Sequence, residues 1–267
     1  MGWRSLGLGA LALIGWSGTA HADERDFCAD RPGKDTPSCA LDPGRFQIEA
    51  GLLDYSHRRD RDTVENDATS GDLLLRYGVN DSLEARAEWQ GYGWSHSRDR
   101  ASGKVDHANG SGDLTLSFRQ NLRHPDDTGT AFAIQPSVTV PVGRNPVGAG
   151  TWSAGIITPF GVDLVKNWRM NLDPEIDAAA DADRHGRHLA YALAASVTHP
   201  LNQALQLSVE GWAMRDDDHA GHQTQASVDF TAAWQPGKNS AIDLSANVGV
   251  THATPRIELA LGVSRRF

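Results

Sequence analysis

Residues 83–90 read Leu-Glu-Ala-Arg-Ala-Glu-Trp-Gln, and this stretch is the most telling one for the fold. Apolar and polar side chains alternate along it without a break, which is the period of a β-strand with two unlike faces. In a soluble β-sandwich the apolar face of such a strand would point inward, whereas in a membrane barrel it would point out to lipid. Polarity alone does not say which face points inward, so the rest of the chain has to decide.

The same alternation recurs from Arg45 to the end of the chain, in runs that are separated by stretches rich in Gly, Asp, Asn, Pro or Ser. Repetition of this kind indicates successive antiparallel strands. We predict twelve of them, at residues 45–55, 73–79, 83–89, 114–118, 132–140, 152–162, 170–176, 189–197, 205–209, 226–234, 242–250 and 257–263.

The connections between these runs alternate in length. Those at residues 80–81, 199–203 and 236–239 are short, whereas residues 56–70 and 95–110 form long polar stretches that we expect to be extracellular loops. Short turns on one side and long loops on the other are typical of outer-membrane barrels, whose even strand number leaves both termini in the periplasm. The predicted fold class is therefore all-β, a transmembrane antiparallel up-and-down β-barrel of about 12 strands over residues 45–267.

Aromatic residues support this topology, because Trp and Tyr favour the two membrane–water interfaces. Trp89, Trp152 and Tyr191 would form the outer girdle, and the periplasmic girdle would contain Phe46, Trp168, Trp234 and Phe267. An alternating last strand that ends in a carboxy-terminal Phe resembles the signal that barrel assembly machinery recognises. We therefore expect that machinery and outer-membrane lipid as partners.

The first residues predict export. Arg4 precedes an apolar stretch at residues 6–16 that closes on Ala20-His21-Ala22, which is the pattern of a signal peptide covering residues 1–22. The apolar stretch is too short to span a bilayer as a helix, and no later run is longer. The expected location is the bacterial outer membrane, with residues 23–44 as a periplasmic segment.

That segment contains Cys28 and Cys39, and these are the two cysteines of the sequence. In an oxidising compartment two cysteines this close together predict a disulfide. A metal or redox site is the alternative.

The net charge is −9 and the isoelectric point is about 5.6. This argues against nucleic acid as a partner and favours cations or neutral solutes. No cofactor is expected.

If the polar faces line the lumen, charged side chains of both signs meet there and would bind or filter a small-molecule solute. They would equally well pair with one another and fill a narrow barrel. The candidate lumen or constriction residues are Arg76, Glu84, Arg86, Glu88, Arg119, Asp173, Glu175 and Asp177.

Two histidine pairs have a spacing that would allow two imidazoles to bind one metal ion and are weak candidates for such a site, namely His185 with His188 and His219 with His222. Solvated loops also use His and Asp freely, so no metal is assigned. Some outer-membrane barrels are lipases, but the sequence has no G-x-S-x-G motif, and Ser95-His96 and Ser196 with His199 offer only the residue types. We therefore expect no enzyme activity and no catalytic residue.

Several stretches resemble the outer-membrane transporter family labelled as the meta-cleavage pathway of phenol degradation. They are residues 28–32 with Cys39, residues 43–49, 186–189, 225–230 and 254–255, and the closing Arg266-Phe267. The resemblance implies a β-barrel that lets small molecules cross the outer membrane, with phenol-like aromatic compounds as the candidate class. A structural or adhesive barrel without transport is the main alternative, and conductance in a lipid bilayer would separate the two.

Overall fold

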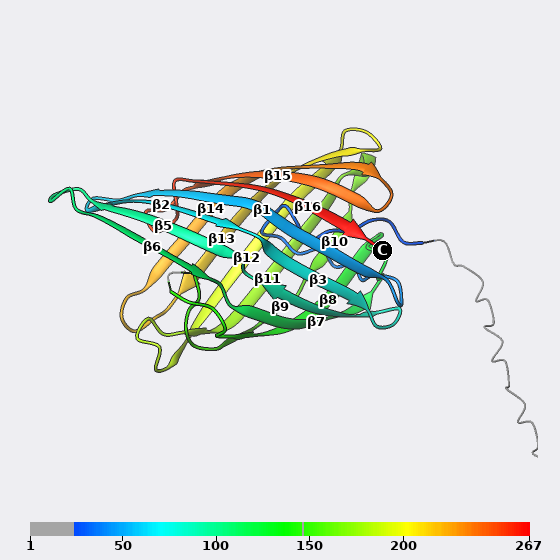
Figure 1. Cartoon of the computed structure of the whole chain (residues 1–267). Coiled ribbons are helices and arrows are strands. Elements are labelled where there is room, and N and C mark those ends of the chain that lie inside the picture. Colours follow the sequence, from blue (N-terminus) through cyan, green and yellow to red (C-terminus); the bar gives the residue numbers. More distant parts are fainter. Residues whose placement is uncertain (1–23, 146) are drawn as a thin grey trace, which may run out of the picture.

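The computed structural model describes residues 24–145 and 147–267, so the expected signal peptide lies outside the described residues. A closed antiparallel barrel makes up most of this part of the chain (Figure 1). Its ends join where β1 pairs with β16, from Gln47 opposite Arg266 to His57 opposite Ile257. The strands are β1 (Phe46–Arg59), β2 (Thr63–Ser70), β3 (Asp72–Gly78), β4 (Leu83–Trp89), β5 (Tyr92–Asp99), β6 (Val105–Ser111), β7 (Leu114–Arg123), β8 (Thr130–Val140), β9 (Ser153–Ile157), β10 (Phe160–Asp163), β11 (Arg169–Ala180), β12 (Arg187–Pro200), β13 (Leu205–Asp216), β14 (Gln223–Gly237), β15 (Ser240–Gly249) and β16 (Ile257–Arg266).

Four pairs of these elements continue one another as single strands with a short break, namely β2 with β3, β4 with β5, β6 with β7 and β9 with β10. The barrel wall therefore has 12 strands, which confirms the predicted fold class and strand number. Gly91 shows why the wall breaks where it does. A Cβ at this position would lie 2.2 Å from the carbonyl oxygen of Ser70, so only glycine fits between β4 and the neighbouring strand.

The expectation of long loops at residues 56–70 and 95–110 is wrong. Strands β1, β2, β5 and β6 continue through these stretches and form a sheet that projects beyond one end of the barrel (Figure 1). Pairing runs out to Arg59 opposite Val64 and to Arg98 opposite Val105. Both faces of a projecting sheet meet water, so these strands need no apolar face and carry no alternating pattern.

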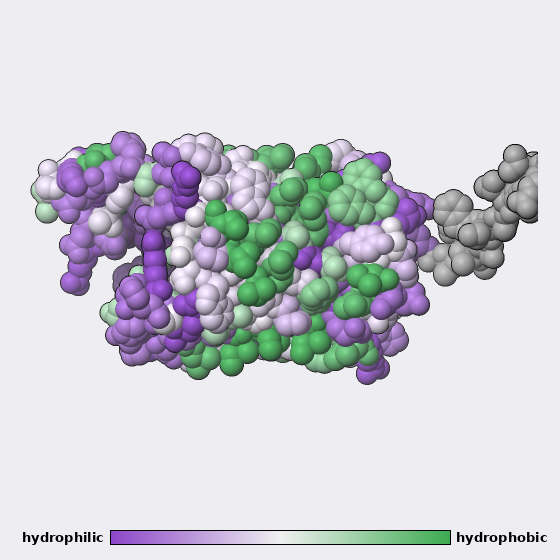
Figure 2. Space-filling view, turned by 60° about the horizontal axis from the view of Figure 1, so that its bottom comes forward, coloured by the Kyte–Doolittle hydropathy of each residue, from purple (hydrophilic) through white to green (hydrophobic). Residues whose placement is uncertain are grey.

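The outer surface of the barrel is apolar and its interior is charged. Phe118 and Leu244 are more than half exposed, at 55% and 54%, whereas Arg76, Arg119 and Glu84 are completely buried. A soluble core would show the opposite, because large contiguous apolar surfaces are rare on soluble proteins. Figure 2 shows the apolar residues as a band between hydrophilic ends. The apolar face of each strand therefore points outward, as expected for contact with lipid.

Exposed aromatic side chains lie toward both ends of the barrel, with Trp152 before β9 and Tyr191 near the start of β12 at the end away from the carboxy terminus. We call the end with the short turns and the carboxy terminus the terminal end, and the opposite end the loop end. Phe46 and Phe267 pack at the terminal end with ring centroids 6.1 Å apart, and Trp168 stacks on His199 there. Among the described residues no helix is long and apolar enough to cross a membrane.

Candidate functional site

The segment before β1, residues 24–44, lies inside the barrel, and we call it the plug (Figure 1). Its side chains reach separate strands of the barrel wall. Arg31 contacts Asp243 on β15 at 3.2 Å, and Arg25 donates a hydrogen bond of 2.8 Å to the carbonyl oxygen of Asp81 in the β3–β4 turn. Cys39, Ala40 and Leu41 are buried. The sequence left open whether the lumen is open or plugged, and the structure answers that a segment crosses it.

A disulfide joins Cys28 and Cys39 and confirms the predicted pairing. The cross-link folds the middle of the plug into a compact loop, with the two Cα atoms 6.6 Å apart. Both ends of the loop are fixed to the wall by arginines. The carbonyl oxygen of Cys28 accepts hydrogen bonds from Arg76 and Gln47, and that of Cys39 accepts one from Arg119.

Three arginines from neighbouring strands surround one carboxylate of the plug. Arg76 on β3, Arg86 on β4 and Arg119 on β7 all form ion pairs with Asp30. The distances to Asp30 are 3.2 Å for Arg76 and 2.7 Å for Arg119. The strand register explains the cluster, because Arg76 lies directly opposite Arg86 on one face of the sheet. Without an anion between them, these like charges would repel one another.

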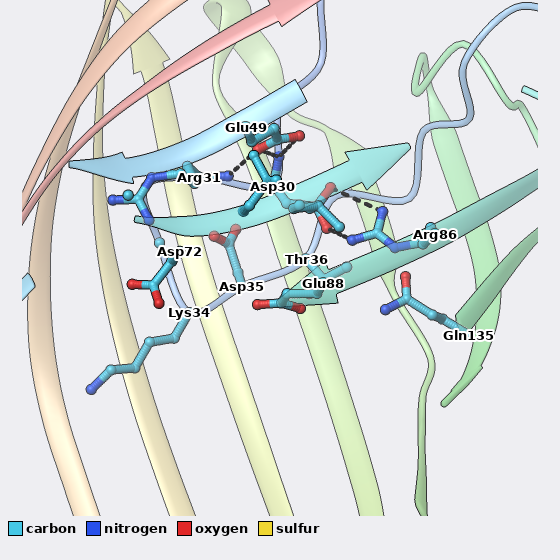
Figure 3. Close-up of a pocket in the computed structure, with 14 residues that line it drawn as sticks. Asp30, Arg31, Lys34, Asp35, Thr36, Glu49, Asp72, Arg86, Glu88 and Gln135 are labelled. Carbon is cyan, nitrogen blue, oxygen red and sulfur yellow. Dashed lines mark hydrogen bonds and ion pairs between the residues drawn. The ribbon is translucent and has the colours of Figure 1, made fainter. Parts of the chain in front are cut away.

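Two carboxylates of the wall complete this cluster. Glu84 pairs with Arg76 and Arg86 at 2.8 Å each, and Glu49 on β1 pairs with Arg76 at 2.9 Å. With Asp30 in place, three guanidinium groups face three carboxylates. Without it, one buried positive charge would lack a partner. Figure 3 shows Asp30 between Glu49 and Arg86.

The plug is also held through its backbone. The N–H groups of Asp30 and Arg31 donate to Glu49, those of Lys34 and Asp35 donate to Glu210, and those of Thr36 and Leu41 donate to Asp173 and Glu84. Six amides of a segment without regular secondary structure are thus satisfied by carboxylates of the barrel wall.

The residues that the sequence singled out for the lumen separate into two groups. Arg76, Glu84, Arg86 and Arg119 belong to the cluster around Asp30, and Asp173 binds the plug backbone. Glu88, Glu175 and Asp177 instead line a cavity of about 350 Å³ together with Lys34 and Thr36. Within residues 24–145 and 147–267, these three carboxylates form no ion pair. Asp30 and Asp35 were not predicted as lumen residues, because the plug has no periodic pattern that would mark them.

Cavities lie on both faces of the plug. A cavity of about 490 Å³ opens toward the loop end, between Glu88, Gln90 and Thr139. Another of about 370 Å³ lies toward the terminal end, and Asp163 and Gln206 contribute to its wall. Arg31 of the plug lines both, and it also lines a third of about 240 Å³ beside Asp30. The plug therefore separates spaces that together run along the lumen.

The histidines do not form the pairs that the sequence suggested. His188 contacts Asp181 and Asp218, and His219 lies near the same two carboxylates. His185 is almost fully exposed beside Asp183, and His222 contacts Asp217. The four histidines all lie at the loop end. His188 contacts buried carboxylates there and not a second imidazole.

The two serines considered for a lipase have other partners. Ser196 donates to Asp35 of the plug at 2.5 Å, and His199 stacks on Trp168. Ser95 and His96 are neighbours on β5 and so point to opposite faces, and His96 contacts His107 across the strand pair. In the part of the chain that the structure describes, neither serine is hydrogen-bonded to a histidine.

Comparison with known proteins gives one family and several similar folds. Residues 29–267 match the family model described as "Putative MetA-pathway of phenol degradation". An outer membrane channel from Pseudomonas putida has a similar structure, with a TM-score of 0.68, 15% identity, and coverage of 89% of this chain and 99% of that one. The translocator domain of the autotransporter NalP from Neisseria meningitidis follows with a TM-score of 0.52, 14% identity, and coverage of 84% and 88%. The transport unit of the autotransporter AIDA-I from Escherichia coli has a TM-score of 0.51, 7% identity, and coverage of 84% and 90%. At these identities the likeness shows the fold, and no curated protein matches the sequence.

Proposed function

The chain belongs to the family described as "Putative MetA-pathway of phenol degradation", and from that premise we propose that it is an outer-membrane channel for small molecules, with phenol-like aromatic compounds as the substrate class. The observation that carries this proposal is the lumen itself. It contains cavities of about 490 Å³ and 370 Å³ on the two faces of a single plug. A barrel with a purely structural role would need neither these spaces nor a separate segment between them.

The plug is the barrier in this proposal. It is attached by ion pairs and by hydrogen bonds from its backbone, without a strand of its own in the wall. Such a segment can shift in the lumen while the closed barrel stays intact. Passage of a solute then requires the plug to move away from Glu210 or from the arginines around Asp30.

The substrate class follows from the family description together with the charge of the lumen. Glu88, Glu175 and Asp177 face the same cavity, so an anion would be repelled there. A phenol-like solute is neutral below its own high pKa, so these carboxylates would not repel it. The printed name of the Pseudomonas putida structure, an outer membrane channel, agrees with passage of small molecules.

Location and biogenesis are part of the proposal. Outer-membrane lipid would contact the exposed apolar band, and the barrel assembly machinery would insert the chain through its last strand, which ends at Phe267. The short turns and both ends of the described chain would then face the periplasm. We propose no catalytic activity for the barrel.

The adhesive alternative has one observation in its favour. The sheet formed by β1, β2, β5 and β6 projects beyond the barrel and ends in polar tips (Figure 1). Its last strand, β6, pairs as a strand only with β5 in the described structure, and on its other edge Ser111 accepts a hydrogen bond from the N–H of Arg144. Adhesion without transport would be supported if the barrel formed tight, non-conducting membranes while cells lost attachment after removal of residues 60–66.

A transport assay tests the proposed function. A strain that lacks the gene should grow more slowly than its parent on phenol at limiting concentration, and at the same rate on succinate. The purified barrel in a planar bilayer should show discrete conductance events, which a protein-free bilayer lacks. Equal growth on limiting phenol together with an ion-tight bilayer would contradict the proposal.

A further inference from the structure

A compact group of metal-binding side chains lies at the loop end, away from the plug. Asp181 follows β11, His188 is at the start of β12, and Asp218 is in the loop between β13 and β14. Nδ1 of His188 is 2.9 Å from Oδ1 of Asp181 and 3.7 Å from Oδ2 of Asp218. One potential ligand atom from each of the three residues lies within 4.8 Å of the others.

These side chains are withdrawn from water. The side chain of His188 is only 7% exposed, and those of Asp181 and Asp218 are 8% and 10% exposed. Nε2 of His188 is buried and has no hydrogen-bond partner, although Oδ1 of Asp216 lies 2.9 Å away. An imidazole this buried, with one nitrogen unsatisfied, is unusual unless it serves a site.

The charge of the group is not balanced by protein cations. Asp181, Asp216 and Asp218 surround the imidazole, and within the described residues no lysine or arginine forms an ion pair with any of them. Even a protonated His188 would leave an excess of two negative charges. Buried carboxylates are normally paired or coordinate a metal ion.

Backbone contacts position the side chains of Asp218 and Asp181. Both oxygens of Asp218 accept N–H bonds, Oδ1 from Ala220 and Oδ2 from Ala182. These bonds lower the pKa of Asp218, so the group is ionised at neutral pH. Gly186 makes room for the other carboxylate, because a Cβ there would lie 2.1 Å from Oδ2 of Asp181.

From this arrangement we propose that Asp181, His188 and Asp218 form a binding site for one divalent transition-metal ion of the Zn²⁺ type. A zinc ion with ligands at about 2.1 Å in tetrahedral geometry needs ligand atoms roughly 3.4 Å apart. The distances of 2.9 Å and 3.7 Å on either side of His188 Nδ1 bracket that value. One imidazole nitrogen with two carboxylate oxygens favours such a metal over Ca²⁺ or Mg²⁺, which take oxygen ligands almost exclusively.

His219 is the nearest candidate for a fourth ligand. Its Nδ1 lies 3.5 Å from Asp218 and 3.8 Å from Asp181, and its side chain is exposed. Water would fill the position equally well. The bound ion would tie the β11–β12 loop to the β13–β14 loop, so its role is to brace the loop end of the barrel. This role does not depend on whether the lumen conducts.

Zinc binding to the folded, untagged barrel in detergent tests the proposal. Equilibrium dialysis against ZnCl₂ should give one zinc ion per barrel, and His188→Gln and Asp181→Asn should each weaken binding by about tenfold or more. Co²⁺ should give visible absorption bands that zinc removes. His185→Ala and His222→Ala are the matched controls, because these exposed histidines lie outside the three-residue group.

Folding of each variant is checked by its heat-modifiable migration on a gel, which separates loss of the site from loss of the barrel. His219→Ala should weaken binding less than His188→Gln. The proposal is overturned if the wild type binds no zinc, or if His188→Gln and Asp181→Asn bind it as tightly as the wild type while both remain folded.

Discussion

The carboxylate of Asp30 lies 2.7 Å from the guanidinium of Arg119, although 89 positions separate the two residues in the sequence. This contact joins the plug to the barrel wall inside the lumen. Arg76 and Arg86 converge on the same carboxylate, so Asp30 is the counterion of a buried cationic cluster. If the plug is the barrier to transport, this contact is where the barrier is attached.

Replacing Asp30 with Asn should loosen the plug. The change leaves Arg76, Arg86 and Arg119 facing only Glu49 and Glu84, and breaking a buried ion-pair network costs about 3–5 kcal/mol. The side chain of Asp30 is 14% exposed, so we expect the lower end of that range. Planar-bilayer recordings should show longer or more frequent open events. Asp60→Asn, in the projecting sheet, is the control and should behave as the wild type.

Removing the disulfide between Cys28 and Cys39 should also loosen the plug. A cross-link that closes a short loop stabilises by about 3 kcal/mol, mainly because it restricts the unfolded segment. Cys28→Ser with Cys39→Ser should therefore raise conductance and make the plug more sensitive to protease added from the terminal end. The barrel should keep its heat-modifiable migration, since the wall contains no cysteine. Protease resistance equal to that of the wild type would show that the disulfide does not hold the plug.

Charge selectivity should depend on Glu88, Glu175 and Asp177, which form no ion pair within the described residues. Glu88→Gln, Glu175→Gln and Asp177→Asn in one variant would remove the negative charge from a cavity wall that Lys34 also lines. The reversal potential in a salt gradient should move from cation preference toward zero. Glu65→Gln, in the projecting strand β2, serves as the control. A reversal potential that stays unchanged would mean that solute ions do not meet this wall.

Much of this organisation could be predicted from the sequence, and the plug shows where prediction stops. Strand β4 alternates so regularly that its two faces followed from the period alone. The lumen position of Glu84 and Arg86 followed once the other strands and their connections indicated a membrane barrel. The prediction of twelve strands was correct because each wall strand has one face toward lipid, which gives it an alternating apolar pattern. Asp30 and Asp35 lie in a segment without regular secondary structure, and their partners are up to 175 positions away, so no local periodicity marks them as lumen residues.

The strands of the projecting sheet were wrongly predicted to be loops for a related reason. Residues 63–70 and 105–111 are polar on both faces, as residues of a loop would be. Their strand conformation comes from pairing with β1 and β5, which a single sequence does not show. In the same way, His188 meets Asp181 and Asp218 because two hairpins lie side by side, whereas sequence spacing suggested His185 as its partner.

Acid should weaken the hydrogen bonds of Asp218 at the loop end only well below neutral pH. Hydrogen bonds from Ala220 and Ala182 lower the pKa of Asp218, so its stabilising contribution is complete above the ordinary Asp value of about 3.9 and is lost as the pH falls through the lowered value. Amide NMR shifts of Ala220 should therefore have a carboxylate titration midpoint below about 3.9. Asp218→Asn should abolish that titration. A midpoint above the ordinary value would contradict the geometry of this loop.

Single-channel recording of the barrel with and without residues 24–42 would show whether the plug closes a conducting lumen. We predict that the wild type shows discrete, mostly closed events and that the shortened protein, still heat-modifiable on a gel, conducts steadily at a several-fold higher level. Two folded proteins that both leave the bilayer ion-tight would contradict the claim that this barrel is a channel closed by its own N-terminal segment.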